Sequence, residues 1–138
     1  MRLILVEDEP FIALDLEFLA KGAGHEVVGI AESLSRAMQL AEREKPDAAL
    51  VDINLRDGMT GPEVCRRLTS EQGMAVGFLT GNADQIPLDF AGAVGVVDKP
   101  FSRQGLEELL AILEQTRDTG RPTPGQTLRF TRLSPSYS

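Results

Sequence analysis

The sequence is poor in the residues that build disulfides, zinc sites and membrane spans. It holds one cysteine, Cys65, and one histidine, His25, in 138 residues. A single cysteine excludes an internal disulfide, and neither residue has a companion cysteine or histidine nearby with which to hold a metal ion, so we expect structural roles for both. No apolar run approaches the roughly 20 residues of a transmembrane helix, and the N-terminus has the pattern of a strand rather than of a signal peptide. We therefore expect a cytoplasmic protein that makes no contact with a membrane.

Basic residues are also scarce in most of the chain. The first 116 residues contain 20 acidic and 10 basic side chains, whereas residues 117–138 contain four arginines and one aspartate. An acidic surface opposes binding to a phosphate backbone, and the basic tail is too short for a recognition helix, so we expect no DNA binding. The length and the composition, 42% hydrophobic and 25% charged residues, fit one globular domain.

Short apolar segments alternate with helical patterns along the first 116 residues. The apolar segments are rich in β-branched residues and nearly continuous, which is typical of strands buried on both faces, and they cover residues 3–6, 27–31, 48–51, 74–79 and 93–97. Helices are expected from Pro10 to about Gly22, from Ser33 to about Pro46, from Gly61 and from Ser102, with a weak one over 82–92, which contains Pro87. The first helix has a broad apolar face made of Phe11, Ile12, Leu14, Leu16, Phe18 and Leu19.

Five strands alternating with five helices predict an α/β fold. The expected architecture is a doubly wound, five-stranded parallel sheet of strand order 2-1-3-4-5, with its functional crevice at the carboxyl ends of the strands. Residues 117–138 are rich in Gly, Pro, Ser and Thr and are interpreted as a flexible tail. The alternation in "TLRFTRL", residues 127–133, leaves open that this stretch adds a strand or docks on an acidic surface.

Chemically useful side chains stand at the ends of four predicted strands. Glu7 and Asp8 follow the first strand, Asp52 ends the third, Thr80 ends the fourth and Lys99 follows the fifth. Two carboxylates about 4 Å apart repel by about 4 kcal/mol at an effective dielectric constant of 20, and Mg²⁺ is the hard cation that best offsets such a cluster. One carboxylate can then attack a phosphoryl group, with the lysine and the threonine as donors to the acyl phosphate.

At these residues, positions 1–116 resemble the receiver domain of bacterial response regulators, which has a flavodoxin-like fold. The resemblance implies that Asp52 accepts a phosphoryl group and that Asp8 and Asp52 bind Mg²⁺ directly. It also implies that Glu7 binds the ion through water and that the backbone carbonyl of Asn54 completes the protein ligands. Many receivers carry Met-Pro after the phosphorylated aspartate, whereas this loop reads "NLRDGMTG". We therefore expect Arg56 and Asp57 to lie close to the site.

The same resemblance assigns roles to the remaining residues. Lys99 pairs with the phosphoryl group, the hydroxyl of Thr80 moves towards it, and the peptide bond before Pro100 is cis. The position three residues before the lysine usually holds an aromatic ring that turns inward when the threonine moves, but here it is Val96. We therefore expect phosphorylation to change the order or position of the neighbouring segment 82–92 instead, with Ile86, Leu88 and Phe90 exposed or hidden together.

The resemblance implies a signalling switch in a two-component phosphorelay. The phosphodonor is a sensor histidine kinase or a histidine phosphotransfer protein, the downstream protein is unknown, and the only reactions catalysed are the chain's own aspartyl phosphorylation and dephosphorylation. A flavodoxin-like FMN site is excluded because "VEDEP" repels a bare phosphate, and an aspartyl phosphatase is disfavoured by Asn54 where a second acid is needed. A receiver-like adaptor that binds partners without phosphorylation remains the alternative.

Overall fold

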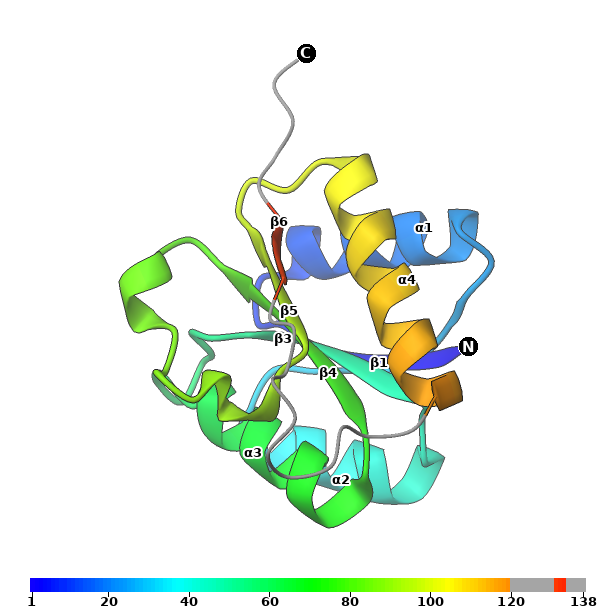
Figure 1. The fold of residues 1–138 in the computed structure, drawn as a ribbon. Coiled ribbons are helices and arrows are strands. Elements are labelled where there is room, and N and C mark those ends of the chain that lie inside the picture. The colour runs from blue at the N-terminus through cyan, green and yellow to red at the C-terminus, as the bar shows by residue number, and fades with distance from the viewer. Residues whose placement is uncertain (120–130, 134–138) are drawn as a thin grey trace.

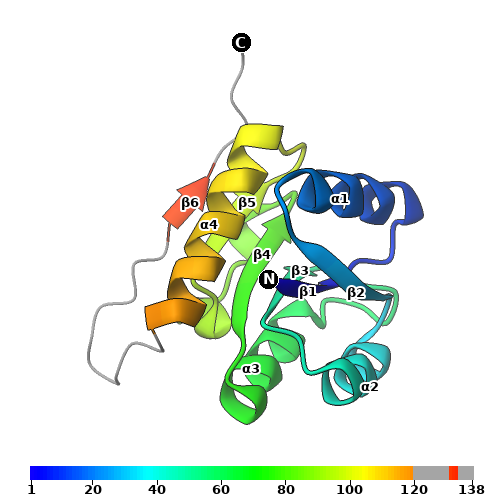
Figure 2. The ribbon, with the colours of Figure 1, turned by 90° about the vertical axis from the view of Figure 1, so that its right-hand side faces the viewer.

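A central parallel sheet carries helices on both of its faces (Figures 1 and 2). The computed structural model describes residues 1–119 and 131–133. The strands are β1 (Arg2–Val6), β2 (Glu26–Ala31), β3 (Ala48–Asp52), β4 (Ala75–Thr80), β5 (Gly95–Asp98) and β6 (Thr131–Leu133). They lie in the order β2-β1-β3-β4-β5-β6, and every neighbouring pair is parallel. The predicted order of the first five strands is confirmed.

The described residues form four α-helices: α1 (Pro10–Gly22), α2 (Leu34–Glu44), α3 (Gly61–Gln72) and α4 (Arg103–Thr119). In Figure 2, α1 and α4 cover one face of the sheet, and α2 and α3 cover the other. The helix starts follow from local chemistry, because the hydroxyls of Ser33 and Ser102 accept hydrogen bonds from backbone amides in the first turns of α2 and α4. Within residues 1–119 and 131–133, no helix combines the length and the apolar character needed to cross a bilayer.

The fourth predicted helix, the weak one over residues 82–92, is not α-helical. The crossover from β4 to β5 contains two single-turn 3-10 helices, η1 (Ala83–Gln85) and η2 (Phe90–Gly92). Pro87 removes a backbone donor from this stretch, and its apolar residues do not share one face. Ile86 packs against the core whereas Leu88 is fully exposed, so these two residues differ in exposure in this structure.

The C-terminal strand β6 lies beside β5, where Gly95 pairs with Thr131 and Val97 with Leu133. The sequence left open whether this stretch adds a strand or docks on an acidic surface, and residues 131–133 form an added strand. Helix α4 runs to Thr119, three residues beyond the predicted end of the domain at residue 116. The rest of the predicted tail, residues 120–130 and 134–138, lies outside the described residues.

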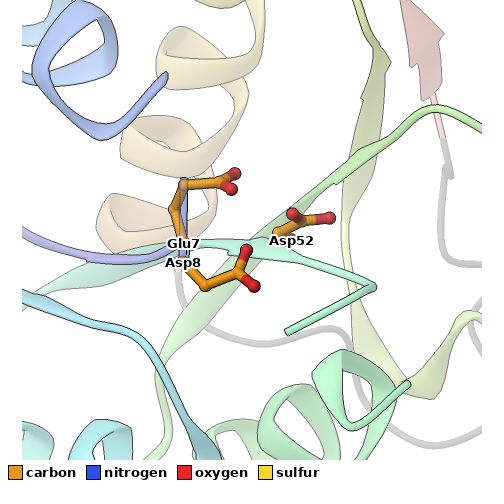
Figure 3. Close-up of side chains that lie close together, drawn as sticks. All are labelled: Glu7, Asp8 and Asp52. Carbon is orange, nitrogen blue, oxygen red and sulfur yellow. The ribbon is translucent and has the colours of Figure 1, made fainter. Parts of the chain in front are cut away.

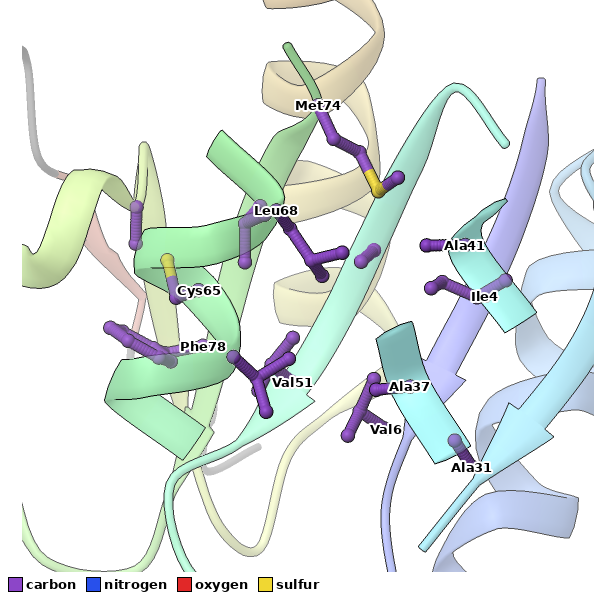
Figure 4. Packing of buried hydrophobic residues seen from close by; sticks show 14 of the residues in the cluster. Ile4, Val6, Ala31, Ala37, Ala41, Val51, Cys65, Leu68, Met74 and Phe78 are labelled. Carbon is purple, nitrogen blue, oxygen red and sulfur yellow. The ribbon is translucent and has the colours of Figure 1, made fainter. Parts of the chain in front are cut away.

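The core has two halves, one on each face of the sheet. Successive residues of β1 alternate between them, so that Ile4 packs beneath α2 and α3 while Leu5 packs beneath α1 and α4. Figure 4 shows part of the first half, in which Cys65 and Phe78 are fully buried. Burial raises the pKa of the Cys65 thiol to about 12, so this cysteine is a packing residue, as predicted.

Helix α1 is more apolar than the core requires. Leu16 is fully buried, but Phe11, Leu14 and Phe18 are 83%, 59% and 66% exposed. These three residues recur at positions i, i+3 and i+7, so they form a stripe on one side of the helix, which we call the α1 stripe. The predicted apolar face is therefore present, but only part of it is covered by the rest of the molecule.

Gly61 brings the start of α3 directly against the end of β3. A Cβ atom at this position would overlap the carbonyl oxygen of Asp52 and lie 2.5 Å from the Cα of Ile53, and neither backbone atom has room to move aside. Gly61→Ala is therefore expected to lower the free energy of unfolding by about 2 kcal/mol, measured by urea denaturation followed by circular dichroism. The matched control is Gly22→Ala, at the open end of α1, which is expected to raise it by about 0.5 kcal/mol. Unchanged stability of Gly61→Ala would contradict this close approach.

Candidate functional site

The carboxyl ends of the central strands bring the predicted site residues to one edge of the sheet. Backbone hydrogen bonds continue one residue past the strand ends: the amide of Ile53 donates to Leu79 at 3.2 Å, and the amide of Lys99 donates to Thr80 at 2.8 Å. The backbone is therefore fixed on both sides of Asp52 and immediately before the lysine side chain. The side chains project from defined positions, as a site built on strand ends requires.

Three carboxylates converge at this edge (Figure 3). Glu7, Asp8 and Asp52 each offer one oxygen atom, and these three atoms lie within 4.8 Å of one another. Glu7 and Asp52 are only 2% and 4% exposed, whereas Asp8 is half-buried. The cluster thus has two buried members and one member that faces the solvent side.

Lys99 is the cation among these carboxylates. Its Nζ donates to Asp52 Oδ2 at 2.8 Å and to Glu7 Oε2 at 3.1 Å. Burial opposes the ammonium charge, but the hydrogen bond to Asp52 and the attraction of Glu7 and Asp52 outweigh it and raise the pKa of Lys99 above its usual value. The other oxygens are also held, because the amide of Glu9 donates to Glu7 Oε1 and the amide of Asn54 donates to Asp52 Oδ1, each at 3.1 Å.

One ammonium does not neutralise three carboxylates, so the cluster keeps an excess of negative charge. Burial and the neighbouring charge of Asp52 raise the pKa of Glu7 to about 7, although Lys99 and the amide of Glu9 act in the opposite direction. A hard divalent cation would remove this excess, and several carboxylate oxygens at a partly open point form the donor set that Mg²⁺ prefers. The residues present therefore fit the predicted ion.

Thr80 lies at the same edge but its hydroxyl is engaged within its own loop. The residue is fully buried, and its Oγ1 donates to the carbonyl of Asn82 at 2.9 Å and accepts from the amide of Asn82 at 3.0 Å. A movement of this hydroxyl towards Asp52 would have to break the bond to that carbonyl. The peptide bond between Lys99 and Pro100 is cis.

Asn54 joins the site to the crossover between β4 and β5. Its side-chain amide donates to Gln85 Oε1 at 2.6 Å and accepts from Gln85 Nε2 at 3.3 Å, which we call the amide pair. No sequence pattern indicates this contact, because a single glutamine in a segment of weak helical pattern does not reveal a partner 31 residues away. Gln85 is the residue beside the site that pattern and resemblance both missed.

Asp57 and Val96 are two further residues that the sequence singles out beside the site. Asp57, expected near the carboxylates, accepts hydrogen bonds from the hydroxyl of Thr60 and from the backbone amide of Leu34 at the start of α2. The bond from Thr60 in particular lowers the pKa of Asp57, so this carboxylate is committed to its own loop. Val96 is fully buried on β5 and pairs in register with Phe78 of β4, so the ring next to this position belongs to the neighbouring strand.

Comparisons with known proteins agree on one family. The sequence profile of the response regulator receiver domain matches residues 3–111. The phyllosphere-induced regulator PhyR of Methylorubrum extorquens is 39% identical over 80 residues, which cover 57% of this chain and 30% of that protein. The transcriptional regulatory protein PdtaR of Mycobacterium tuberculosis is 30% identical over 118 residues, which cover 82% of this chain and 55% of that protein. The chain thus spans about half or less of the length of these relatives.

A solved structure shows the same fold. The crystal structure of the response regulator PhyR from Brucella abortus matches with a TM-score of 0.77 and 32% sequence identity. The match covers 86% of this chain and 49% of that chain.

The raised pKa of Glu7 predicts that the free energy of unfolding of the metal-free protein depends on pH. Between its ordinary value of 4.5 and about 7, the folded protein keeps a proton that the unfolded chain has lost. The contribution of Glu7 to the free energy of unfolding therefore falls as pH rises through this window and is constant above it. Glu7→Gln, which imitates the protonated form, is expected to remove this decline and to be more stable than the wild type at about pH 7.5, by up to about 3 kcal/mol.

The measurement is urea unfolding from about pH 4 to about pH 8 in the presence of a chelator. Glu9→Gln, a change at the neighbouring exposed carboxylate, serves as the control and is expected to follow the wild type. Excess Mg²⁺ at about pH 7.5 is expected to stabilise the wild type, because the ion binds the folded state. Parallel pH profiles for the wild type and Glu7→Gln would refute the assignment.

Proposed function

This chain belongs to the response regulator receiver domain family, and we propose that it is a phosphorylation-dependent signalling switch in which Asp52 accepts a phosphoryl group from a histidine kinase or a histidine phosphotransfer protein. The observation that carries the proposal is the meeting of Asp52 with Glu7, Asp8 and Lys99 at one edge of the sheet. The protein acts in the cytoplasm and turns over no external substrate. It catalyses only its own phosphorylation and dephosphorylation.

Asp52 is arranged as a nucleophile. The amide of Asn54 and the ammonium of Lys99 hold one oxygen each, so the carboxylate is oriented before a donor arrives. A carboxylate oxygen attacks phosphorus, the new O–P bond forms while the N–P bond of the phosphohistidine breaks, and the imidazole leaves. Lys99 then shifts its hydrogen bond from the carboxylate to a phosphoryl oxygen, where its positive charge stabilises the product.

Mg²⁺ would be held by Asp8, Asp52 and the backbone carbonyl of Asn54, with Glu7 acting through a water molecule. When bound, the ion neutralises the charge that develops on the phosphoryl oxygens. The carboxylate cluster supports this arrangement, because its excess negative charge matches the charge of a divalent cation. Thr80 supplies a further donor once its hydroxyl leaves the carbonyl of Asn82.

The α1 stripe supplies a surface for a protein phosphodonor. Helix α1 begins at Pro10, two residues after Asp8, so its first turn stands at the rim of the site. A donor protein must bring its histidine to Asp52 and therefore has to cover this rim. Exposed aromatic and aliphatic side chains grouped on one side of a helix are typical of a contact surface. A small phosphodonor reaches the same aspartate without touching the stripe.

Asp52 is expected to be the only phosphorylated residue. Treatment with a small phosphodonor and Mg²⁺, followed by peptide mass mapping, should label the wild type at Asp52 and leave Asp52→Asn unlabelled. Asp57→Asn is the control, because Asp57 is bonded to Thr60 and Leu34, and this variant should be labelled like the wild type. A label that persists in Asp52→Asn would refute the assignment. An unlabelled wild type that still binds partners would favour the adaptor alternative.

The α1 stripe gives a second prediction. Phe11→Ala and Phe18→Ala are each expected to slow phosphotransfer from a phosphorylated histidine phosphotransfer protein about tenfold, since losing a buried ring contact weakens docking by roughly 1.4 kcal/mol. Labelling by a small phosphodonor should not change. Leu88→Ala is the matched control, because Leu88 is a fully exposed apolar residue that lies on the crossover and outside the α1 stripe. Equal slowing with both kinds of donor would argue against a docking role.

A further inference from the structure

Side-chain hydrogen bonds hold the crossover between β4 and β5 at two points. At its start, the amide pair joins Gln85 of η1 to Asn54, in the loop after β3. At its end, the two terminal guanidinium nitrogens of Arg66 on α3, Nη1 and Nη2, donate to the carboxylate of Asp89, which also accepts from the backbone amide of Ala91. The segment between these points carries the fully exposed Leu88.

The end of the crossover has an unfavourable backbone conformation. Phe90 and Ala91 have φ angles of 56° and 51°, in the left-handed region that residues with a Cβ atom seldom adopt. Ala91 is nevertheless buried. Such a conformation persists only while its surroundings hold it, and segments of this kind are found in elements that change state.

The turn η1 contacts the site through two routes. Its Gln85 holds the side chain of Asn54, whose own backbone amide donates to Asp52 Oδ1. The backbone amide of Gln85 donates to the carbonyl of Asn82, which also accepts from the hydroxyl of Thr80. A displacement of either Asn54 or Thr80 is therefore transmitted to the same three-residue turn.

We propose that Gln85 is a positioning residue of the site, and that the amide pair couples metal binding and phosphorylation at Asp52 to the conformation of the crossover. Gln85 orients the loop that carries Asn54, whose backbone carbonyl is the expected Mg²⁺ ligand. The coupling is reciprocal, because a contact that favours the bound form of the loop is itself favoured when the site is occupied. This inference rests on the proposed function. It connects the state of Asp52 to the crossover without the aromatic ring that Val96 replaces.

A purely structural amide pair would behave differently. It would stabilise the fold by the same amount whether the site is empty or occupied, and its loss would leave Mg²⁺ affinity unchanged. A positioning role predicts that Gln85→Ala weakens Mg²⁺ binding about fivefold, the effect of one lost hydrogen bond. Gln85→Met keeps the length of the side chain and its neutral charge but makes neither hydrogen bond, so it should weaken Mg²⁺ binding as much as Gln85→Ala.

The experiment combines calorimetric titration with Mg²⁺ and hydrogen exchange on the full chain. Exchange of residues 82–92 is compared in the chelated, Mg²⁺-bound and beryllium fluoride-treated protein, where beryllium fluoride imitates the phosphoryl group. Arg66→Ala is the matched control, because it releases the crossover from α3 without touching the loop after Asp52. It should speed exchange near Asp89 in every state and keep the wild-type Mg²⁺ affinity. Gln85→Ala should lose the difference between states.

The outcomes separate this inference from the proposed function. Labelling of Asp52 by a small phosphodonor is measured on the same samples, and an unlabelled wild type would overturn the phosphorylation switch. The Mg²⁺ titration tests the role of Gln85 whether or not Asp52 is labelled. Wild-type affinity in Gln85→Ala, or an unchanged exchange response of residues 82–92 in that variant, would overturn the inference. Equally weakened binding in Gln85→Ala and Gln85→Met would support it.

Discussion

The repulsion among carboxylates at the end of a buried sheet governs this structure. Strands β1 and β3 consist mainly of buried apolar residues. Glu7, which follows β1, and Asp52, which ends β3, therefore have little freedom to separate or to reach water. Lys99 offsets part of their charge, and the raised pKa of Glu7 records the part that remains. A site that binds a divalent cation and a phosphoryl group starts from this imbalance, because each incoming charge has an uncompensated partner.

The input and the response of the proposed switch lie on opposite sides of β3. Helix α1 follows β1, which pairs with one edge of β3, whereas the crossover follows β4, which pairs with the other. The α1 stripe and the crossover therefore follow strands on different sides of β3. Asp52, at the end of the strand between them, is the residue that both sides share.

The sequence predicted the parts of the molecule that depend on a single periodicity. Buried parallel strands are short apolar runs, and the polar residue that ends each run faces the crevice, so the strand order and the positions of Asp52 and Lys99 could be predicted before the structure. The same patterns could not show which side of α1 the sheet covers. The exposed stripe that contains Phe11 has the same helical spacing as a stripe that faces the core, so the sequence does not distinguish the two. The contact between Asn54 and Gln85 depends on two loops meeting in space, and no local pattern encodes it.

Strand β6 makes β5 an interior strand of the sheet rather than an edge strand. A parallel sheet that ended at β5 would present a row of unpaired backbone groups to other chains, and it would do so on the strand that leads into Lys99. With Thr131–Leu133 paired along it, β5 has a neighbour on each side, and the outermost strand is only three residues long. So short an edge is a poor template for the sheet-to-sheet association that leads to aggregation. Strand β6 thus leaves β5, the strand that leads into Lys99, without a free edge.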